Sequence, residues 1–141
     1  MEDCQFCKIA SHSVKTEILY ENVSTISFLD HRPLSKGHAV VIPKTHFVNI
    51  YDIDCSTLNE VTRVAKLLAI KLNEKYVPLG INLLQNNGEY AGQTVFHFHL
   101  QIIPRYDDKY VKMLREIALS RNVADAKVSE PIAKEIRKTL D

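Results

Sequence analysis

Residues 96–103 read Phe96-His97-Phe98-His99-Leu100-Gln101-Ile102-Ile103, an alternation of apolar and polar side chains that predicts a β-strand. We expect this strand to cover residues 95–103 and to stop at Pro104, because proline lacks the N–H that a sheet ladder uses. Successive side chains of a strand point to opposite faces, so His97, His99 and Gln101 should share a polar face, while the apolar residues from Phe96 onward face the core. Same-face neighbours lie roughly 6.5 to 7 Å apart, which lets two imidazoles and an amide bracket a phosphate-sized group.

Four other segments rich in β-branched or aromatic residues predict further strands, which gives a sheet of about five strands. They are residues 17–20, 23–29, 38–42 and 80–84. The first two should form a hairpin around Glu21 and Asn22, because turn-forming residues separate them.

One long helix is predicted between these strands. From Ser56 onward, apolar residues recur at three- and four-residue steps, and Ser56 stands where an N-cap is expected. The residues of this apolar stripe are Leu58, Val61, Val64, Ala65, Leu68 and Leu72. The helix should end before Pro78, and similar spacing after Asp107 predicts C-terminal helices. Strands on both sides of one long helix favour an α+β domain with an antiparallel sheet.

Length and composition indicate a single domain over residues 1–141. The formal net charge of +1 gives no general attraction to nucleic acid or to an anionic membrane, so any anion site must be local. No stretch approaches the roughly 20 apolar residues that a membrane helix needs. We therefore expect a cytoplasmic protein that binds neither nucleic acid nor membrane.

Cys4 and Cys7 have the C-x2-C spacing with which two thiolates hold one metal ion. A tetrahedral site would need two further ligands from elsewhere in the chain. Two reduced thiols without a metal remain an alternative. A small zinc-dependent nucleic-acid binder is a third reading, which the near-neutral charge disfavours.

Several motifs resemble the histidine triad (HIT) superfamily, in particular its zinc-containing bacterial and archaeal members. The chain from Gly92 to Arg105, which includes the strand quoted above, is similar to the signature of that superfamily. The resemblance extends to residues 4–9, 28–30, 37–46 and 86–88, and covers about residues 4–106. It implies a HIT-like fold, a nucleotide substrate and a homodimer. The helical tail, residues 107–141, lies outside the resemblance.

The resemblance also implies roles for individual residues. His99 corresponds to the nucleophile that forms a covalent nucleotidyl-imidazole intermediate, and Asp30 to the acid that binds the ribose hydroxyls. A neutral imidazole suits this chemistry, because it is available near pH 7 without a separate strong base. The remaining nucleotide contacts are Asn86, Gly92, Thr94, Gln101 and His38, with Thr94 and Gln101 also implied in catalysis. A simple turn at Gly92 and Thr94, and a buried strand start at His38, are the alternatives.

Gln101 departs from the superfamily pattern, which has a third histidine there. The resulting His-x-His-x-Gln motif resembles the galactose-1-phosphate uridylyltransferase and diadenosine-tetraphosphate phosphorylase branches. Because an amide does not titrate, Gln101 can donate a hydrogen bond but cannot deliver a proton to a leaving group. Three functions stay open: a hydrolase of nucleoside phosphoramidates or dinucleoside polyphosphates, a nucleotidyltransferase or phosphorylase, and a non-catalytic nucleotide sensor.

In zinc-containing relatives, the two ligands beyond the cysteine pair correspond to His46 and His97. The resemblance therefore implies a structural Zn²⁺ bound by Cys4, Cys7, His46 and His97. Such a cation, about 7 Å along the strand from His99, should disfavour protonation of His99 and keep it nucleophilic.

Overall fold

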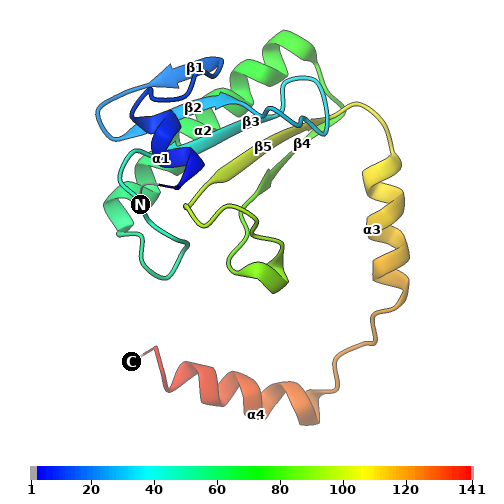
Figure 1. Cartoon of the computed structure of the whole chain (residues 1–141). Helices are drawn as coiled ribbons and strands as arrows, with labels where there is room; N and C mark the ends of the chain where they lie inside the picture. Colours follow the sequence, from blue (N-terminus) through cyan, green and yellow to red (C-terminus); the bar gives the residue numbers. More distant parts are fainter. Residues whose placement is uncertain (1–2, 141) are drawn as a thin grey trace. The chain divides into compact units, whose positions relative to one another are not determined.

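A computed structural model describes residues 3–140 and has the α+β architecture that the sequence predicts (Figure 1). Five strands form one antiparallel sheet in the order β1-β2-β3-β5-β4. The strands are β1 (Ile18–Glu21), β2 (Thr25–Leu29), β3 (Ala39–Pro43), β4 (Gly80–Leu84) and β5 (Leu100–Arg105). The helices are α1 (Gln5–Ala10), α2 (Cys55–Tyr76), the short 3-10 helix η1 (Glu89–Ala91), α3 (Lys109–Leu119) and α4 (Ala126–Arg137).

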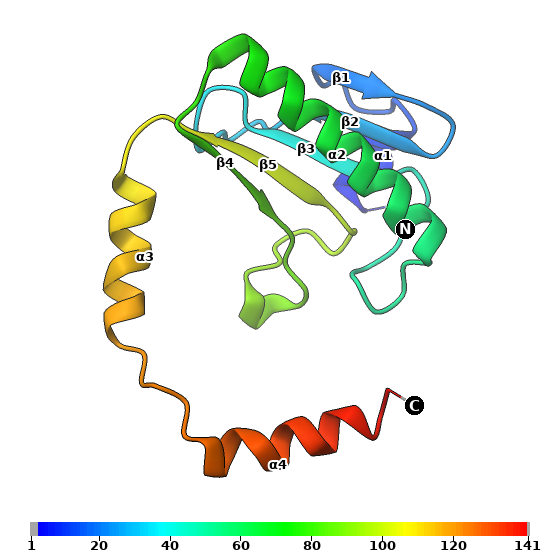
Figure 2. The same ribbon diagram turned by 180° about the vertical axis from the view of Figure 1, so that it is seen from behind.

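The two faces of the sheet are covered by different helices. Figure 2 shows α2 across one face, and α1 lies on the opposite face in both views. In β3, Ala39 and Val41 belong to the core cluster beneath α2, while Val40 and Ile42 belong to the cluster that contains residues of α1. This two-sided burial explains why β3 is a continuous apolar run rather than an alternating one.

The apolar stripe predicted for the long helix is confirmed, because Val61, Val64 and Ala65 of α2 are fully buried. The predicted start is wrong. Asp54 is the N-cap, and its carboxylate accepts hydrogen bonds from the Thr57 main-chain N–H at 2.9 Å and from the Thr57 hydroxyl at 2.7 Å. A carboxylate at this position also interacts favourably with the helix dipole, so the helix begins before Ser56. The predicted end before Pro78 is confirmed.

The strand predicted over residues 95–103 is wrong at both ends. The chain bends at residues 95–97, where the Phe98 N–H donates to the Phe47 carbonyl at 2.6 Å instead of to a neighbouring strand, and Phe96 is half exposed. At the other end, β5 continues through Pro104 to Arg105. The Arg105 carbonyl accepts a hydrogen bond from the Leu79 N–H, so Arg105 faces this side of the sheet and the nitrogen of the neighbouring Pro104 points to the opposite side. On that side, the pairing of β3 with β5 has already ended at Ile102.

The remaining strand boundaries differ from the prediction by one or two residues, except the end of β2 at Leu29 and both ends of β4, which agree. In the β1–β2 hairpin, the Asn22 side chain accepts from the N–H groups of Ser24 and Thr25. The turn therefore reaches Ser24, and β2 begins later than expected.

The chain divides into two compact units, Met1–Asp107 and Asp108–Asp141. The second unit contains α3 and α4, which confirms the helices predicted in the tail. Neither helix has a buried residue, and each carries half-exposed apolar side chains, among them Ile117 and Ile132. Among residues 3–140, no helix is both long and apolar enough to cross a membrane.

Candidate active site and metal centre

Four predicted metal ligands lie together on the α1 side of the sheet. Cys4 and Cys7 come from the start of α1, His46 follows β3, and His97 precedes β5. One potential ligand atom from each residue lies within 4.8 Å of all the others. Segments that are distant in the sequence therefore converge on one point.

The spacing of these atoms fits a tetrahedral zinc ion. The Nδ1 atom of His97 is 3.5 Å from the Sγ atoms of both Cys4 and Cys7, and Cys7 Sγ is 3.3 Å from His46 Nδ1. With Zn–S of about 2.3 Å and Zn–N of about 2.0–2.1 Å, a sulfur and a nitrogen ligand are about 3.6 Å apart in a tetrahedron. Two sulfur and two nitrogen donors are also a usual set for structural zinc.

The protonation of His97 suits a ligand role. Its Nε2 atom is 2.9 Å from the Pro43 carbonyl, which can only accept, so the ring proton is on Nε2 and the Nδ1 lone pair faces the thiols. Burial lowers the pKa of His97 to about 4, which keeps the ring neutral near pH 7. Burial, followed by the neighbouring Cys4, raises the pKa of the Cys7 thiol to about 11, so metal binding must release a proton there.

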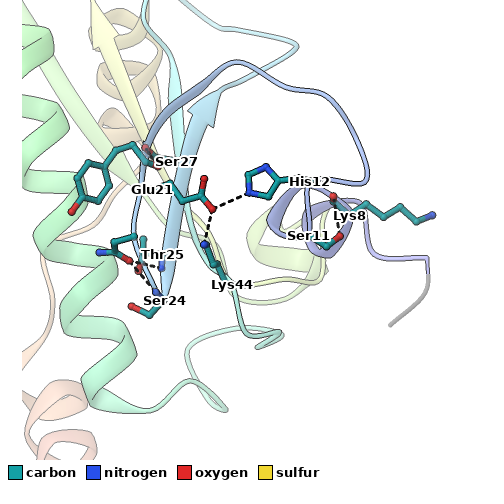
Figure 3. A network of polar contacts seen from close by, with 10 residues as sticks. Lys8, Ser11, His12, Glu21, Ser24, Thr25, Ser27 and Lys44 are labelled. Carbon is teal, nitrogen blue, oxygen red and sulfur yellow. Dashed lines mark hydrogen bonds and ion pairs between the residues drawn. The ribbon is translucent and has the colours of Figure 1, made fainter.

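A polar contact ties together the segments that carry these ligands (Figure 3). Oε1 of Glu21 in β1 lies 2.6 Å from Lys44 Nζ and 2.9 Å from His12 Nε2. His12 follows α1, which carries Cys7, and Lys44 precedes His46 by two residues. Glu21 thus links the segment that follows Cys7 to the segment that carries His46.

Beside this cluster is a pocket of about 600 Å³. It brings together five of the residues predicted for nucleotide binding or catalysis: Asp30, His38, Thr94, His99 and Gln101. Its apolar walls include Phe6, Phe28 and Val40. Phe6 also belongs to the core cluster on this face, together with Ile9 and Ile26, which do not line the pocket.

His99 presents one ring nitrogen to this pocket. Its Nδ1 atom is 2.8 Å from the His97 carbonyl, so Nδ1 carries the proton and the lone pair is on Nε2. The Phe6 ring contacts the His99 ring edge to face, with centroids 5.2 Å apart. Burial is the largest cause of a lowered pKa at His99, which leaves a neutral imidazole whose Nε2 can attack an electrophile.

Three polar residues, Asp30, His38 and Gln101, line the pocket together with His99. The Nε2 atom of His38 is 3.1 Å from Gln101 Oε1 and 3.8 Å from Asp30 Oδ2. Asp30 also accepts from the Arg32 main-chain N–H at 2.7 Å, which orients its carboxylate. Burial lowers the pKa of His38, with the Asp30 carboxylate opposing the shift.

Two of the residues predicted to contact the nucleotide, Asn86 and Gly92, are not among those that line this pocket. Asn86 and Gly92 contact each other, because the Asn86 Nδ2 group donates to the Gly92 carbonyl at 3.1 Å. Gly92 has φ of +84°, a left-handed conformation that favours glycine. Gln93, which the sequence interpretation did not single out, is buried and bonds to Gly88 and Val48, so it shapes this loop.

His31 and Arg32 also line the pocket and were not predicted. Their one available signal is that they follow Asp30 directly in the sequence. Both are exposed, so they add positive or titratable groups at its rim.

Comparisons with known proteins place these features in context. A family model described as HIT domain matches residues 11–108. Protein hit of Bacillus subtilis is 41% identical over 105 residues, which cover 74% of this chain and 72% of that protein. Adenosine 5'-monophosphoramidase HNT1 of Candida albicans is 38% identical over 109 residues, covering 74% of this chain and 72% of the relative. The crystal structure of a zinc-bound histidine triad family protein from Mycobacterium smegmatis matches with a TM-score of 0.72 and 36% identity, over 77% of this chain and 78% of that one.

Proposed function

Because the chain belongs to the HIT domain family, we propose that it is a nucleotide hydrolase that cleaves the bond between an α-phosphate and its leaving group. The observation that carries the proposal is the hydrogen bond from His99 Nδ1 to the His97 carbonyl, which leaves Nε2 as an available nucleophile in a pocket lined by Asp30. The name of the Candida albicans relative, an adenosine 5'-monophosphoramidase, supports this reaction class.

In the proposed complex, Asp30 accepts hydrogen bonds from the ribose hydroxyls, and Phe6 with Phe28 packs against the base. Thr94 and Gln101 donate to oxygens of the α-phosphate and of the leaving group. Asn86 and Gly92 act by shaping the loop that precedes Thr94. These contacts would place the phosphorus beside His99.

The reaction then proceeds in two displacements. The lone pair of His99 Nε2 forms a bond to phosphorus while the bond to the leaving group breaks and its electron pair departs with that group. As the imidazole becomes cationic, the His97 carbonyl accepts the Nδ1–H and stabilises the charge. Water then attacks phosphorus, the bond between phosphorus and Nε2 breaks with its electron pair returning to Nε2, and the proton lost by the water passes to solvent. His99 returns to its neutral form as the nucleoside monophosphate leaves.

Cys4, Cys7, His46 and His97 would hold a Zn²⁺ ion. When bound, the ion would supply a structural cross-link between α1, the end of β3 and the segment that carries His99. The zinc-bound Mycobacterium smegmatis protein supports this assignment.

We also propose that two copies associate along β4. Within residues 3–140 this strand pairs with β5 alone and is an edge of the sheet, and its side chain Leu83 is half exposed, as is Ile70 of α2, which lines the same surface hollow. An unpaired edge with apolar side chains favours pairing with a second copy. Light scattering should give twice the chain mass, and Leu83→Lys should lower it toward the monomer value. A monomer at all concentrations would contradict this.

A substrate panel tests the reaction. It contains adenosine, guanosine and uridine phosphoramidates, dinucleoside polyphosphates and nucleotide sugars, each with and without inorganic phosphate. A hydrolase releases nucleoside monophosphate that carries oxygen from the water, and the mass of protein quenched in alkaline denaturant increases by one nucleotidyl group on His99. Transfer to phosphate would yield nucleoside diphosphate instead, which the motif ending in Gln101 makes the second candidate. Nucleotide binding with no adduct and no product would contradict both and indicate a sensor.

A further inference from the structure

Both ring nitrogens of His38 have a partner, and one of these partners can only donate. His38 is 2% exposed, and its Nδ1 atom lies 3.1 Å from the main-chain nitrogen of Leu34. A main-chain N–H is a donor, so Nδ1 must accept and carries no proton. The single proton of the neutral imidazole is then on Nε2, and burial, which lowers the pKa of His38, favours this neutral form.

The position of that proton determines the orientation of the neighbouring amide. His38 Nε2 lies 3.1 Å from the Gln101 side chain, and because Nε2–H donates, the amide atom that faces it must be the oxygen. Asp30 Oδ2, at 3.8 Å from the same nitrogen, is beyond hydrogen-bond distance. The two contacts, from Leu34 to His38 and from His38 to Gln101, therefore fix the Gln101 amide with its oxygen toward His38 and its nitrogen away from it.

The amide nitrogen of Gln101 is then the group left for a ligand. Gln101 lies opposite Val40 in the sheet register, and both residues line the pocket that contains His99. Within residues 3–140, no hydrogen bond engages Gln101 Nε2. An amide NH2 group donates and cannot accept, and it has no proton to transfer near neutral pH.

We propose that His38 is a positioning residue that presents the Gln101 NH2 group to the leaving group as a fixed donor, so that the site selects leaving groups that depart as oxyanions. This inference rests on the proposed function. When a P–O bond breaks, the electron pair stays on the leaving oxygen, which accepts a hydrogen bond from Gln101 and needs no proton. When a P–N bond of a phosphoramidate breaks, the pair stays on nitrogen, which must receive a proton that Gln101 cannot supply. Phosphoanhydrides and aryl phosphate esters should therefore exceed phosphoramidates as substrates.

The first test measures the dependence of kcat on the leaving group. Adenosine 5'-phosphate esters of phenols with graded pKa values are compared with an alkyl phosphoramidate in the wild type and in Gln101→His. The wild type should show a steep fall of kcat with rising phenol pKa. Gln101→His, which restores a titratable group, should weaken this dependence of kcat on the phenol pKa. It should also raise the ratio of the phosphoramidate kcat to the ester kcat at least about tenfold. A shallow wild-type dependence, or an unchanged ratio in Gln101→His, would overturn the inference.

The second test addresses His38 with a matched pair of variants. His38→Leu removes the donor, so the amide can rotate, and kcat for the esters should fall about tenfold with KM within about threefold. His38→Gln can keep an N–H near the position of Nε2 and should remain closer to the wild type than His38→Leu. Equal losses in the two variants, or no loss in His38→Leu, would contradict the positioning role, and thermal melting identifies any variant that does not fold.

A third measurement does not depend on turnover. Two-dimensional NMR of protein with ¹⁵N-labelled histidine should show His38 as the neutral Nε2–H tautomer near pH 7. The Nδ1–H tautomer or a protonated ring would overturn the inference whatever the kinetics. If no ester gives an adduct on His99, the proposed function fails, and the tautomer still decides whether His38 can orient Gln101.

Discussion

His97 and His99 are two residues apart, both are buried, and yet they present opposite nitrogens to their surroundings. His97 uses Nε2 to donate to the Pro43 carbonyl, which turns Nδ1 toward the thiols. His99 uses Nδ1 to donate to the His97 carbonyl, which leaves Nε2 for the pocket. The two residues are of the same type, so the predicted metal ligand and the predicted nucleophile differ in which ring nitrogen donates to a carbonyl and which is left free.

The largest effect should come from removing the nucleophile alone. In His99→Asn, the side-chain amide can still donate to the His97 carbonyl, but it has no lone pair suited to attack phosphorus. We expect kcat to fall by about 10⁴-fold or more, with zinc content unchanged. Rate measurements, mass spectrometry of the quenched protein and metal analysis test this. A covalent nucleotidyl adduct on the variant, or loss of zinc, would show that the two histidines do not have separate roles.

Zinc removal should produce the converse result, a large change in stability with a smaller change in chemistry. For a ligand present at about a thousand times its Kd, binding adds about 4 kcal/mol to the free energy of unfolding, so a chelator should lower stability by about this amount. Denaturant unfolding with and without chelator measures it, and Cys7→Ser should already be insensitive to the chelator. Purified protein that never contained zinc would contradict the assignment of Cys4, Cys7, His46 and His97.

Phe6 touches both histidines, so its replacement should affect both regions to an intermediate degree. Its ring centroid lies 5.9 Å from that of His97 and 5.2 Å from that of His99, and it is buried. Phe6→Leu should cost about 1–2 kcal/mol of unfolding free energy through lost packing, and should raise KM several-fold. Urea unfolding and steady-state kinetics provide the two readings. A change in stability with KM unaltered would place Phe6 in the core alone.

The smallest effect is expected at Glu21, which acts from the surface. Glu21→Gln weakens the pairs with Lys44 and His12, and because solvent screens exposed pairs of this kind, the loss of stability should be small. Zinc should dissociate slightly faster to a competing chelator, with kcat unchanged. Ser24→Ala, a nearby exposed change, is the control. A large fall in kcat would mean that Glu21 is coupled to His99 and not only to the metal cluster.

Much of the fold could be predicted because its signals are local. The three- and four-residue spacing of Val61, Val64 and Leu68 reports the buried face of α2, since helix geometry alone puts these side chains together. The limits of β4 agree for a similar reason. The N-cap was wrong because two residues of similar capping preference, Asp54 and Ser56, stand close together, and the choice depends on which side chain reaches a free N–H, here Asp54 to Thr57.

The segment around His97 could not be predicted from alternation. A strand pattern reports which side chains are apolar, but it does not report the partner of each main-chain group. The Phe98 N–H bonds to Phe47, which lies in a connection far away in the sequence, and this contact takes the segment out of the sheet. His97 consequently lies in a bend rather than in a strand, and both His97 and His99 are buried.

The sequence by itself determined the kinds of groups present: two cysteines at metal-binding spacing, alternating histidines, Asp30 and a glutamine in place of a third histidine. These depend on residue type and spacing, which folding does not alter. The tertiary structure alone decided which nitrogen of each histidine is available. That choice depends on single hydrogen bonds to groups such as the Pro43 carbonyl and the Leu34 N–H, whose positions relative to the rings exist only after the chain has folded.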